Sequence, residues 1–365
     1  MPVRQLPSNP DLEHLKYQAR DLKKLHAARD RGAAQRMREF HPQCRDLTDE
    51  AIFDRKMSLA DAQLTIARER GFKSWPRLKD YVDKPELAER IKKPRHELIE
   101  DAAFRQAVDL LDAGDAAGLR EHLKAHKKLL LQRVEFEGWN YFRNPTLLEF
   151  VAENPIRHGK LPESIVEVAR VILEEGPDQA SRDTTLALVA TGSVPLRMGL
   201  AVPLIELLCE YGADPDGAID AAALHGSLLA VRALLKQGAR MTLPVAAALN
   251  DMEKVRRLLA TATKQERHVA LAMASQIGWI EVARLLLDAG EDPNRYNPIG
   301  GHSHTTPLHQ AALIGNDALV RLLLKHGANP NMRDLMWEGT PADWARHEGH
   351  ADVEAHLRGL ENKRE

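Results

Sequence analysis

Residues 306–330 decide the fold, and they read TPLHQAALIGNDALVRLLLKHGANP. Alanine and leucine recur at helical spacing on both sides of Gly315, which predicts a short helix before this glycine and a second helix at 317–325. The second segment ends in LLKHG, and the glycine at 327 suits the left-handed conformation that ends many helices. The dipeptide NP at 329–330 then favours a turn. This stretch therefore predicts a unit of helix, turn, helix, glycine cap and hairpin.

The same Leu-Leu-x-x-Gly-like phrase recurs along the chain, and each copy predicts the end of a helix whose leucines pack inward. The glycines of these copies are Gly114, Gly176, Gly212, Gly238, Gly290 and Gly327. Aromatic residues make up only 5% of the chain, which favours helix over sheet. The sequence therefore predicts an all-α protein built from internal repeats.

The stretch at 306–330 resembles the ankyrin repeat almost position for position, and GTPADWA at 339–345 begins a similar terminal copy. Degenerate copies can be followed back to about Ala102. The resemblance implies an all-α ankyrin-repeat solenoid of helix-turn-helix repeats with hairpin fingers. In this family the inner helices and finger tips bind a partner, usually a protein, and no reaction is implied. The resemblance also implies that Thr306 and His309 tie a hairpin to its helix.

We expect three regions, namely an N-terminal helical domain at 1–83, a linker at 84–101 and an ankyrin-repeat array at 102–361 with about seven to eight repeats. Gly212 and Gly238 are 26 positions apart, whereas the family period is about 33 residues. The next 52 positions, which end at Gly290, hold two more units of the same length. The middle three units are therefore short, and we expect them to lack a finger.

The spacing of the repeats predicts a groove between two walls. A floor without fingers, at about 217–265, would lie between them. The first wall is expected at 134–144 together with 179–183. The second wall is expected at 292–305 together with 333–339. A groove of this kind suits an extended partner, and we expect the partner to be a protein or a peptide.

Both walls are rich in Tyr, Trp, Arg and Asn, which combine large contact area with hydrogen bonding and are frequent at binding surfaces. The residues expected to contact the partner are Trp139, Asn140, Tyr141, Arg143, Asn144, Arg295, Tyr296, Asn297, His302, His304 and Trp337. Three further residues, at the floor, are expected to face the groove, namely His225, Asn250 and Gln276.

A second interpretation is a small-molecule-binding protein or an enzyme that uses one wall. Its candidate residues are Glu149, Glu153, Arg157, His158, His302 and His304. On a helix the two glutamates would share a face, and paired carboxylates can perform acid–base chemistry, although a structural ion-pair network is the favoured interpretation. No metal or cofactor is expected, because two histidines alone do not form a zinc site and no phosphate-binding loop or nucleophile elbow occurs.

The first 83 residues lack the repeat and predict separate helices. Leucine and alanine between Leu12 and Leu25 follow helical spacing, and Ser58 with Asp61 predicts a capping box. The stretch at 63–81 superficially resembles a helix-turn-helix, so nucleic-acid binding is a further alternative, but its basic residues are sparse. We expect these helices to cap the end of the solenoid and to bury Phe72 and Trp75. The arrangement resembles a group of bacterial ankyrin-repeat proteins.

Composition and charge indicate a cytoplasmic protein. The 51 basic and 53 acidic residues nearly balance, which argues against a chain coated with nucleic acid. Two cysteines are too few for a disulfide scaffold and suit a reducing compartment. No secretory signal is recognised, and no apolar run is long enough to cross a membrane, so no membrane partner is expected.

Overall fold

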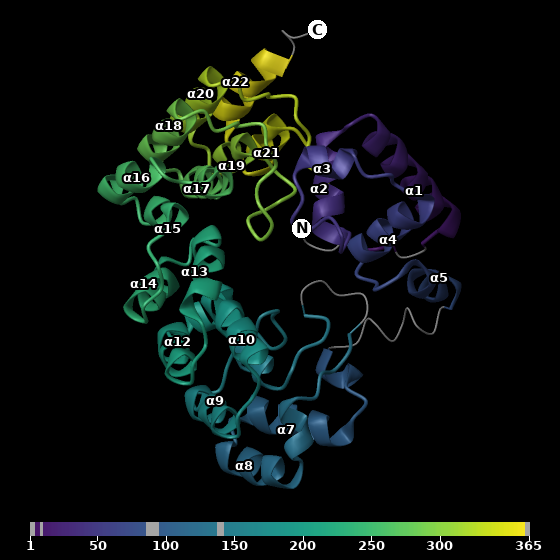
Figure 1. The fold of residues 1–365 in the computed structure, drawn as a ribbon, viewed down its shortest axis with the longest axis vertical. Coiled ribbons are helices and arrows are strands. Elements are labelled where there is room, and N and C mark those ends of the chain that lie inside the picture. Colours follow the sequence, from purple (N-terminus) through teal and green to yellow (C-terminus); the bar gives the residue numbers. More distant parts are fainter. Residues whose placement is uncertain (1–3, 8–9, 85–94, 137–141, 362–365) are drawn as a thin grey trace. The chain divides into compact units, whose positions relative to one another are not determined.

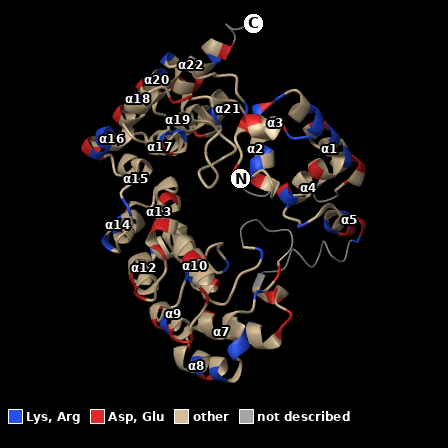
Figure 2. Ribbon diagram, viewed as in Figure 1, with Lys and Arg blue, Asp and Glu red and all other residues tan. Residues whose placement is uncertain are grey.

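The computed structural model describes residues 4–7, 10–84, 95–136 and 142–361. The chain divides into two compact units, Pro2–Asp214 and Pro215–Glu365, and each is described by itself (Figure 1). Every regular element within the four described ranges is a helix, which confirms the predicted all-α class. No helix among these residues is long and apolar enough to span a membrane. Figure 2 shows acidic and basic residues scattered over the helices of both units.

The C-terminal unit is built from five consecutive helix pairs. The pairs are α13 (Pro215–Leu224) with α14 (Leu228–Lys236), α15 (Leu243–Ala248) with α16 (Met252–Leu259), α17 (Lys264–Ile277) with α18 (Ile280–Asp288), α19 (Pro307–Leu313) with α20 (Asp317–Lys325), and α21 (Pro341–His347) with α22 (Ala351–Glu361). Helices α13, α15, α17, α19 and α21 pack side by side in one layer, and α16, α18, α20 and α22 form a second layer (Figure 1). This stacking of pairs is the expected solenoid.

A continuous apolar core lies between the two layers of the C-terminal unit. The first layer contributes mainly alanines such as Ala270 and Ala311, whose small side chains let neighbouring helices approach closely, and the second layer contributes leucines such as Leu286 and Leu323. These four side chains are fully buried. Burying one leucine contributes about 2 kcal/mol. A single helix pair buries few such side chains by itself, so the stability of the core depends on the stacking of several pairs.

The glycine caps adopt the predicted left-handed conformation. The six phrase glycines have φ angles between 73° at Gly114 and 96° at Gly238. Five of them follow the second helix of a pair. Gly114 is different, because α7 (Ala102–Ala113) ends at this glycine and α8 (Ala116–Ala125) begins almost at once. The prediction that this phrase ends a helix is confirmed at Gly114, which caps α7 in the left-handed conformation and lies in the turn between α7 and α8.

The N-terminal unit begins with five helices that share a core. They are α1 (Leu12–Ala27), α2 (Arg31–Phe40), α3 (Asp49–Phe53), α4 (Leu59–Glu69) and α5 (Trp75–Asp83). Phe72 is buried in this core, as expected, whereas Trp75 is only partly buried and packs against it. The residues of this core come from the first five helices and the segments beside them. The predicted capping box at Ser58 and Asp61 is confirmed.

Further helices complete the N-terminal unit. They are η1 (Arg95–Leu98), α7, α8, η2 (Lys127–Leu130), η3 (Leu148–Ala152), α9 (Ile165–Glu174), α10 (Gln179–Thr191), α11 (Ser193–Arg197) and α12 (Ala201–Glu210). Residues 179–183, which were expected in the first wall, form the first turns of α10 rather than a finger. The reason is local, because Asp178 caps this helix by accepting a hydrogen bond from the Ser181 N–H.

Candidate functional site

Three connecting segments carry most of the residues singled out in the sequence. We call residues 134–145 finger 1, residues 291–306 finger 2 and residues 328–340 finger 3. Finger 1 belongs to the N-terminal unit, and fingers 2 and 3 belong to the C-terminal unit.

Fingers 2 and 3 are joined to each other by hydrogen bonds. The Leu335 N–H donates to the His304 carbonyl at 2.9 Å, and the Tyr296 hydroxyl donates to the Arg333 carbonyl at 2.9 Å. Closer to the helices, the Asn294 side-chain amide donates to the Gly327 carbonyl at 2.9 Å. These contacts are spread along both fingers, so the two fingers form one connected surface.

Finger 2 lies against the first-layer helices of its own unit. The Gln276 side-chain amide of α17 donates to the Gly301 carbonyl at 3.0 Å. A Cβ atom at Gly301 would come within 2.7 Å of the Leu224 side chain of α13, so the backbone of the finger lies close to this helix. The expectation that Gln276 faces an open floor is wrong, because the amide is held by the finger. His225 and Asn250 are exposed.

An aromatic cluster lies where fingers 2 and 3 meet α21. The ring of His304 is 5.3 Å from that of Trp337 and 5.8 Å from that of Trp344, and the two indoles are 5.9 Å apart. His304 is only 3% exposed, whereas Trp337 is 65% exposed. Both ring nitrogens of His304 are buried without a hydrogen-bond partner. Burial lowers the pKa of His304 to about 4, so the ring is neutral at neutral pH.

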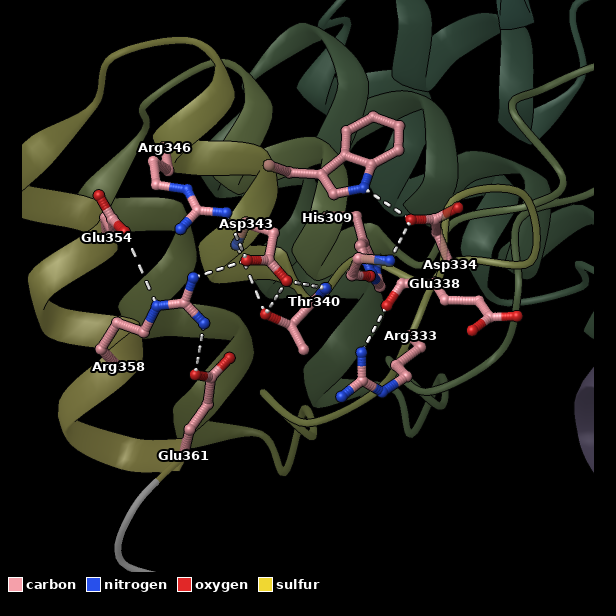
Figure 3. A network of polar contacts seen from close by, with 12 residues as sticks. His309, Arg333, Asp334, Glu338, Thr340, Asp343, Arg346, Glu354, Arg358 and Glu361 are labelled. Carbon is pink, nitrogen blue, oxygen red and sulfur yellow. Dashed lines mark hydrogen bonds and ion pairs between the residues drawn. The ribbon is translucent and has the colours of Figure 1, made fainter.

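Asp334 holds the tip of finger 3 in place (Figure 3). One carboxylate oxygen accepts hydrogen bonds from the N–H groups of Met336 and Trp337 at 2.8 and 2.7 Å. The other oxygen accepts from the Gly339 N–H at 2.8 Å and from the indole N–H of Trp344 at 3.1 Å. Burial raises the pKa of Asp334, but these hydrogen bonds outweigh burial and keep the pKa below its usual value.

Sequence reasoning missed Asp334, although its position carries a signal. An aspartate that begins a turn commonly accepts hydrogen bonds from the backbone N–H groups two and three residues later. Here those residues are Met336 and Trp337, and the turn brings the second of them to the surface. A search for such turns beside exposed aromatic residues would have found the aspartate together with Trp337.

Several residues of fingers 2 and 3 that were expected to contact a partner instead bond to other residues of their own finger. Asn297 is fully buried, and its side-chain amide donates to the Thr305 hydroxyl at 3.2 Å. Arg295 pairs with the buried Glu291 at 3.0 Å. Since Asn297 and His304 are buried, neither presents its side chain to a partner in this conformation, contrary to expectation. His302 is exposed.

Finger 1 is described only at its base. The Phe136 N–H donates to the Arg143 carbonyl at 2.7 Å, and the stacked rings of Phe136 and Phe142 are 6.2 Å apart. Arg143 is half-buried and donates to the Arg68 carbonyl at 3.2 Å, whereas Asn144 is exposed. Three expected contact residues lie outside the described residues, namely Trp139, Asn140 and Tyr141.

The two candidate glutamates do not share a helix face, contrary to expectation. Glu149 lies within the short η3, and Glu153 follows it with a left-handed φ of 45°. Glu149 accepts hydrogen bonds from the N–H and hydroxyl of Thr146 at 3.1 and 3.2 Å. Glu153 accepts from the backbone N–H groups of Arg157 and Gly159 at 2.7 and 2.9 Å. The two carboxylates therefore each stabilise a different turn of the backbone.

Arg157 and His158 belong to the same loop as Glu153. The Arg157 guanidinium donates to both carboxylate oxygens of Asp112 at 2.8 and 2.6 Å and lies 3.2 Å from Glu153. His158 lies 3.1 Å from Asp112. These contacts attach the loop to α7, as a structural ion-pair network would. No group of three or more metal-binding side chains occurs in the described part of the chain.

Comparison with known proteins identifies the repeats. Residues 243–334 match a family model described as ankyrin repeats, in three copies. Cyclin-dependent kinase 4 inhibitor B of Bos taurus is 40% identical over 83 residues, which is 23% of this chain and 60% of the inhibitor. An ankyrin repeat-containing protein of Treponema pallidum is 46% identical over 67 residues, covering 18% of this chain and 21% of that protein.

A further relative is also an ankyrin-repeat protein that matches this chain over only part of its length. Ankyrin repeat and SOCS box protein 6 of Mus musculus is 35% identical over 79 residues, which is 22% of this chain and 18% of that protein. The chain therefore matches less than two thirds of the length of each of these relatives. The likeness concerns the repeats rather than the whole proteins.

Proposed function

The chain contains ankyrin repeats, and we propose that its C-terminal unit binds a protein or peptide partner through the joined surface of fingers 2 and 3. Ankyrin repeats generally mediate binding between proteins. A relative, cyclin-dependent kinase 4 inhibitor B, is by its name an inhibitor of a protein kinase. In this proposal Trp337 is the main contact residue, and His302 contributes at the edge.

The exposure of Trp337 is the observation that carries this proposal. A tryptophan that is 65% exposed leaves a large apolar surface in water, which is unfavourable unless a partner covers it. Tryptophan is also among the residues whose loss most often weakens protein interfaces. Asp334 accepts a hydrogen bond from the Trp337 backbone, so the residue is already ordered before binding, and less entropy is lost when a partner binds.

The other expected residues support this surface indirectly. Tyr296 joins finger 2 to finger 3 through its hydroxyl, and Arg295 neutralises the buried Glu291 at the base of the finger. Substitutions at these two residues are expected to disturb the shape of the surface. A substitution at Trp337 removes the exposed contact area and two ring contacts, to His304 and Trp344, but no hydrogen bond or ion pair of its side chain among the described residues, which makes it the cleaner test.

The test compares two exposed apolar residues of the same unit. Leu229 on α14 is 64% exposed, nearly the same as Trp337, but it lies on a helix rather than on a finger. A partner is first identified by cross-linking the full chain in its host, and its affinity is then measured with purified proteins. We expect Trp337→Ala to weaken binding at least 30-fold, which corresponds to about 2 kcal/mol, and Leu229→Ala to change it less than threefold.

The opposite pattern would contradict the proposal. Equal affinity of the well-folded Trp337→Ala variant and the unchanged chain would remove this residue from the interface. A large loss in the Leu229→Ala variant would place the interface on α14. Circular dichroism and urea unfolding of both variants establish that the fold is retained.

A further inference from the structure

We infer that the group which the partner places against Trp337 is a basic side chain, either the ammonium of lysine or the guanidinium of arginine. This inference rests on the proposed function, because it names the chemistry of the partner at the same surface. Three features of the finger tips carry it, namely an exposed indole, two nearby carboxylates without ion pairs, and an uncharged buried imidazole.

The exposed indole is the first feature. A cation placed over the face of a tryptophan ring is attracted by the ring electrons, more strongly than over other aromatic side chains. The Trp337 ring contacts His304 and Trp344 at interplanar angles of 80° and 59°. These tilted contacts orient the ring and still leave 65% of the residue in solvent. A cation can therefore reach the ring without any rearrangement of the fingers.

Two carboxylates in the turn that carries Trp337 are the second feature. All four hydrogen bonds to Asp334 come from uncharged N–H groups, and Asp334 has no ion pair among the described residues. Glu338 directly follows Trp337 in the sequence and is exposed, and within the described ranges it too makes no ion pair. Two negative charges thus belong to the turn that carries Trp337, one buried against its backbone N–H and one on the next residue, and they favour a cation over an acidic group there.

The nearby arginine does not occupy this position. The Arg333 guanidinium donates to the Glu338 carbonyl at 2.6 Å. In Figure 3 the Arg333 guanidinium and the Asp334 carboxylate point to different sides of finger 3. Asp334 is itself buried, so its charge acts on a bound cation from beneath the surface, whereas Glu338 is exposed and can be approached from solvent.

The third feature is the buried His304. Both of its ring nitrogens lack hydrogen-bond partners, and burial lowers its pKa to about 4. The imidazole is therefore uncharged at neutral pH and contributes no positive charge beneath the indole. A charged imidazole at this place would oppose a bound cation, whereas the neutral ring acts as an apolar support.

The test uses small probes on the full-length protein. Tetramethylammonium chloride and neopentyl alcohol have nearly the same shape, but only the first is charged. Indole N–H resonances are followed by nuclear magnetic resonance during both titrations at constant ionic strength, and Trp337→Phe assigns the Trp337 signal. We expect a saturable shift of this signal with tetramethylammonium at millimolar concentrations or above, and no comparable shift with neopentyl alcohol.

A matched pair of charge variants tests the carboxylates. We expect Glu338→Gln to weaken tetramethylammonium binding about two- to fivefold, the effect of one partly exposed charge. Glu253→Gln, on α16, removes an equal charge elsewhere in the unit and is expected to change nothing. Equal shifts with both probes, no shift with either, or identical titrations of the two variants would overturn the inference.

The outcomes also separate this inference from the proposed function. If tetramethylammonium causes no shift but Trp337→Ala still abolishes capture of the identified partner, the surface binds an uncharged group and the proposed function stands. If tetramethylammonium binds but Trp337→Ala leaves the partner affinity unchanged, the proposed function fails and the cation site remains.

Discussion

Thr306 in the C-terminal unit and Thr146 in the N-terminal unit begin similar turns, but the residue three positions later is His309 in one and Glu149 in the other. The Thr306 N–H donates to Nδ1 of His309 at 3.2 Å, and the Thr306 hydroxyl lies 2.8 Å from the same nitrogen. Glu149 accepts the corresponding two hydrogen bonds from Thr146. In both turns the threonine N–H and hydroxyl are held by the side chain three positions later, but the accepting group is an imidazole in one turn and a carboxylate in the other.

The difference teaches what histidine adds to a repeat. Nδ1 of His309 accepts a hydrogen bond, so the proton of the neutral ring is on Nε2. Nε2 donates this proton to the Gly339 carbonyl at 3.2 Å, and the bond links this repeat to finger 3. An ionised carboxylate has no proton to donate. Glu149 instead lies 3.4 Å from Arg133, and burial, as the largest influence, raises the pKa of Glu149. Histidine therefore connects neighbouring repeats, whereas a carboxylate must find a cation.

The last repeat supports this explanation. Asp343 occupies the same place after Thr340, accepting the Thr340 N–H at 2.8 Å, and it also accepts from Arg358 at 2.6 Å (Figure 3). Its helix pair, α21 and α22, is the final one of the unit, so no further finger follows within the described residues. The carboxylate here again accepts from the threonine and pairs with a cation, as Glu149 does with Arg133.

The largest expected effect comes from removing the link. His309→Ala loses the hydrogen bonds to Thr306 and Gly339 and leaves a cavity, so we expect the free energy of unfolding to fall by about 3 kcal/mol. His304→Ala is the matched control, because His304 is equally buried but makes no hydrogen bond through its ring, and it should cost clearly less. Urea unfolding of the full chain measures both, and hydrogen exchange of 306–345 locates the loss. Equal costs would show that the link contributes nothing.

Acidification should weaken the same unit without any mutation. Burial lowers the pKa of His309 and of His304 to about 4, whereas an unfolded histidine has a pKa of 6.5. Below pH 6.5 the unfolded chain binds more protons than the folded chain, so stability falls from pH 6.5 to about pH 4, by at most roughly 3 kcal/mol for each histidine. Urea unfolding between pH 7 and pH 4.5 measures the decrease, which His304→Gln should reduce by about half. An unchanged slope in that variant would contradict the assignment.

The smallest effect is a contrast between two carboxylates. Although burial raises the pKa of Asp343, the bonds from Thr340 and Arg358 outweigh it and lower the pKa to about 2, so the ionised form is stabilising above about pH 4. Asp343→Asn should cost about 2 kcal/mol at pH 7. The pKa of Glu149 is shifted in the opposite direction, upward, because burial disfavours its ionised form. Glu149→Gln should therefore be neutral or slightly stabilising. Unfolding free energies at pH 7 compare the two, and a large loss in Glu149→Gln would show that its ionised form is required.

Parts of the site followed from residue patterns alone. Trp337 was expected at a surface and is exposed, and Thr306 with His309 forms the expected tie. Asn297 and His304 were expected at a surface as well, but they are buried, because finger 2 folds against α17 and Leu224 instead of standing apart. A sequence pattern shows which residues lie in a finger, but the side on which the finger rests depends on contacts with helices distant in the chain.

The sequence by itself determined the all-α repeat fold, because helical spacing, glycine caps and threonine caps act between residues only a few positions apart. These local preferences recur in each helix pair and do not depend on contacts between distant parts of the chain. Only the tertiary structure decided which polar side chains are available to a partner. Asp334 joins residues of finger 3 to Trp344, and Gln276 reaches Gly301 across 25 positions. Such pairings depend on how repeats stack, and stacking is set by the sum of many packing contacts rather than by any short motif.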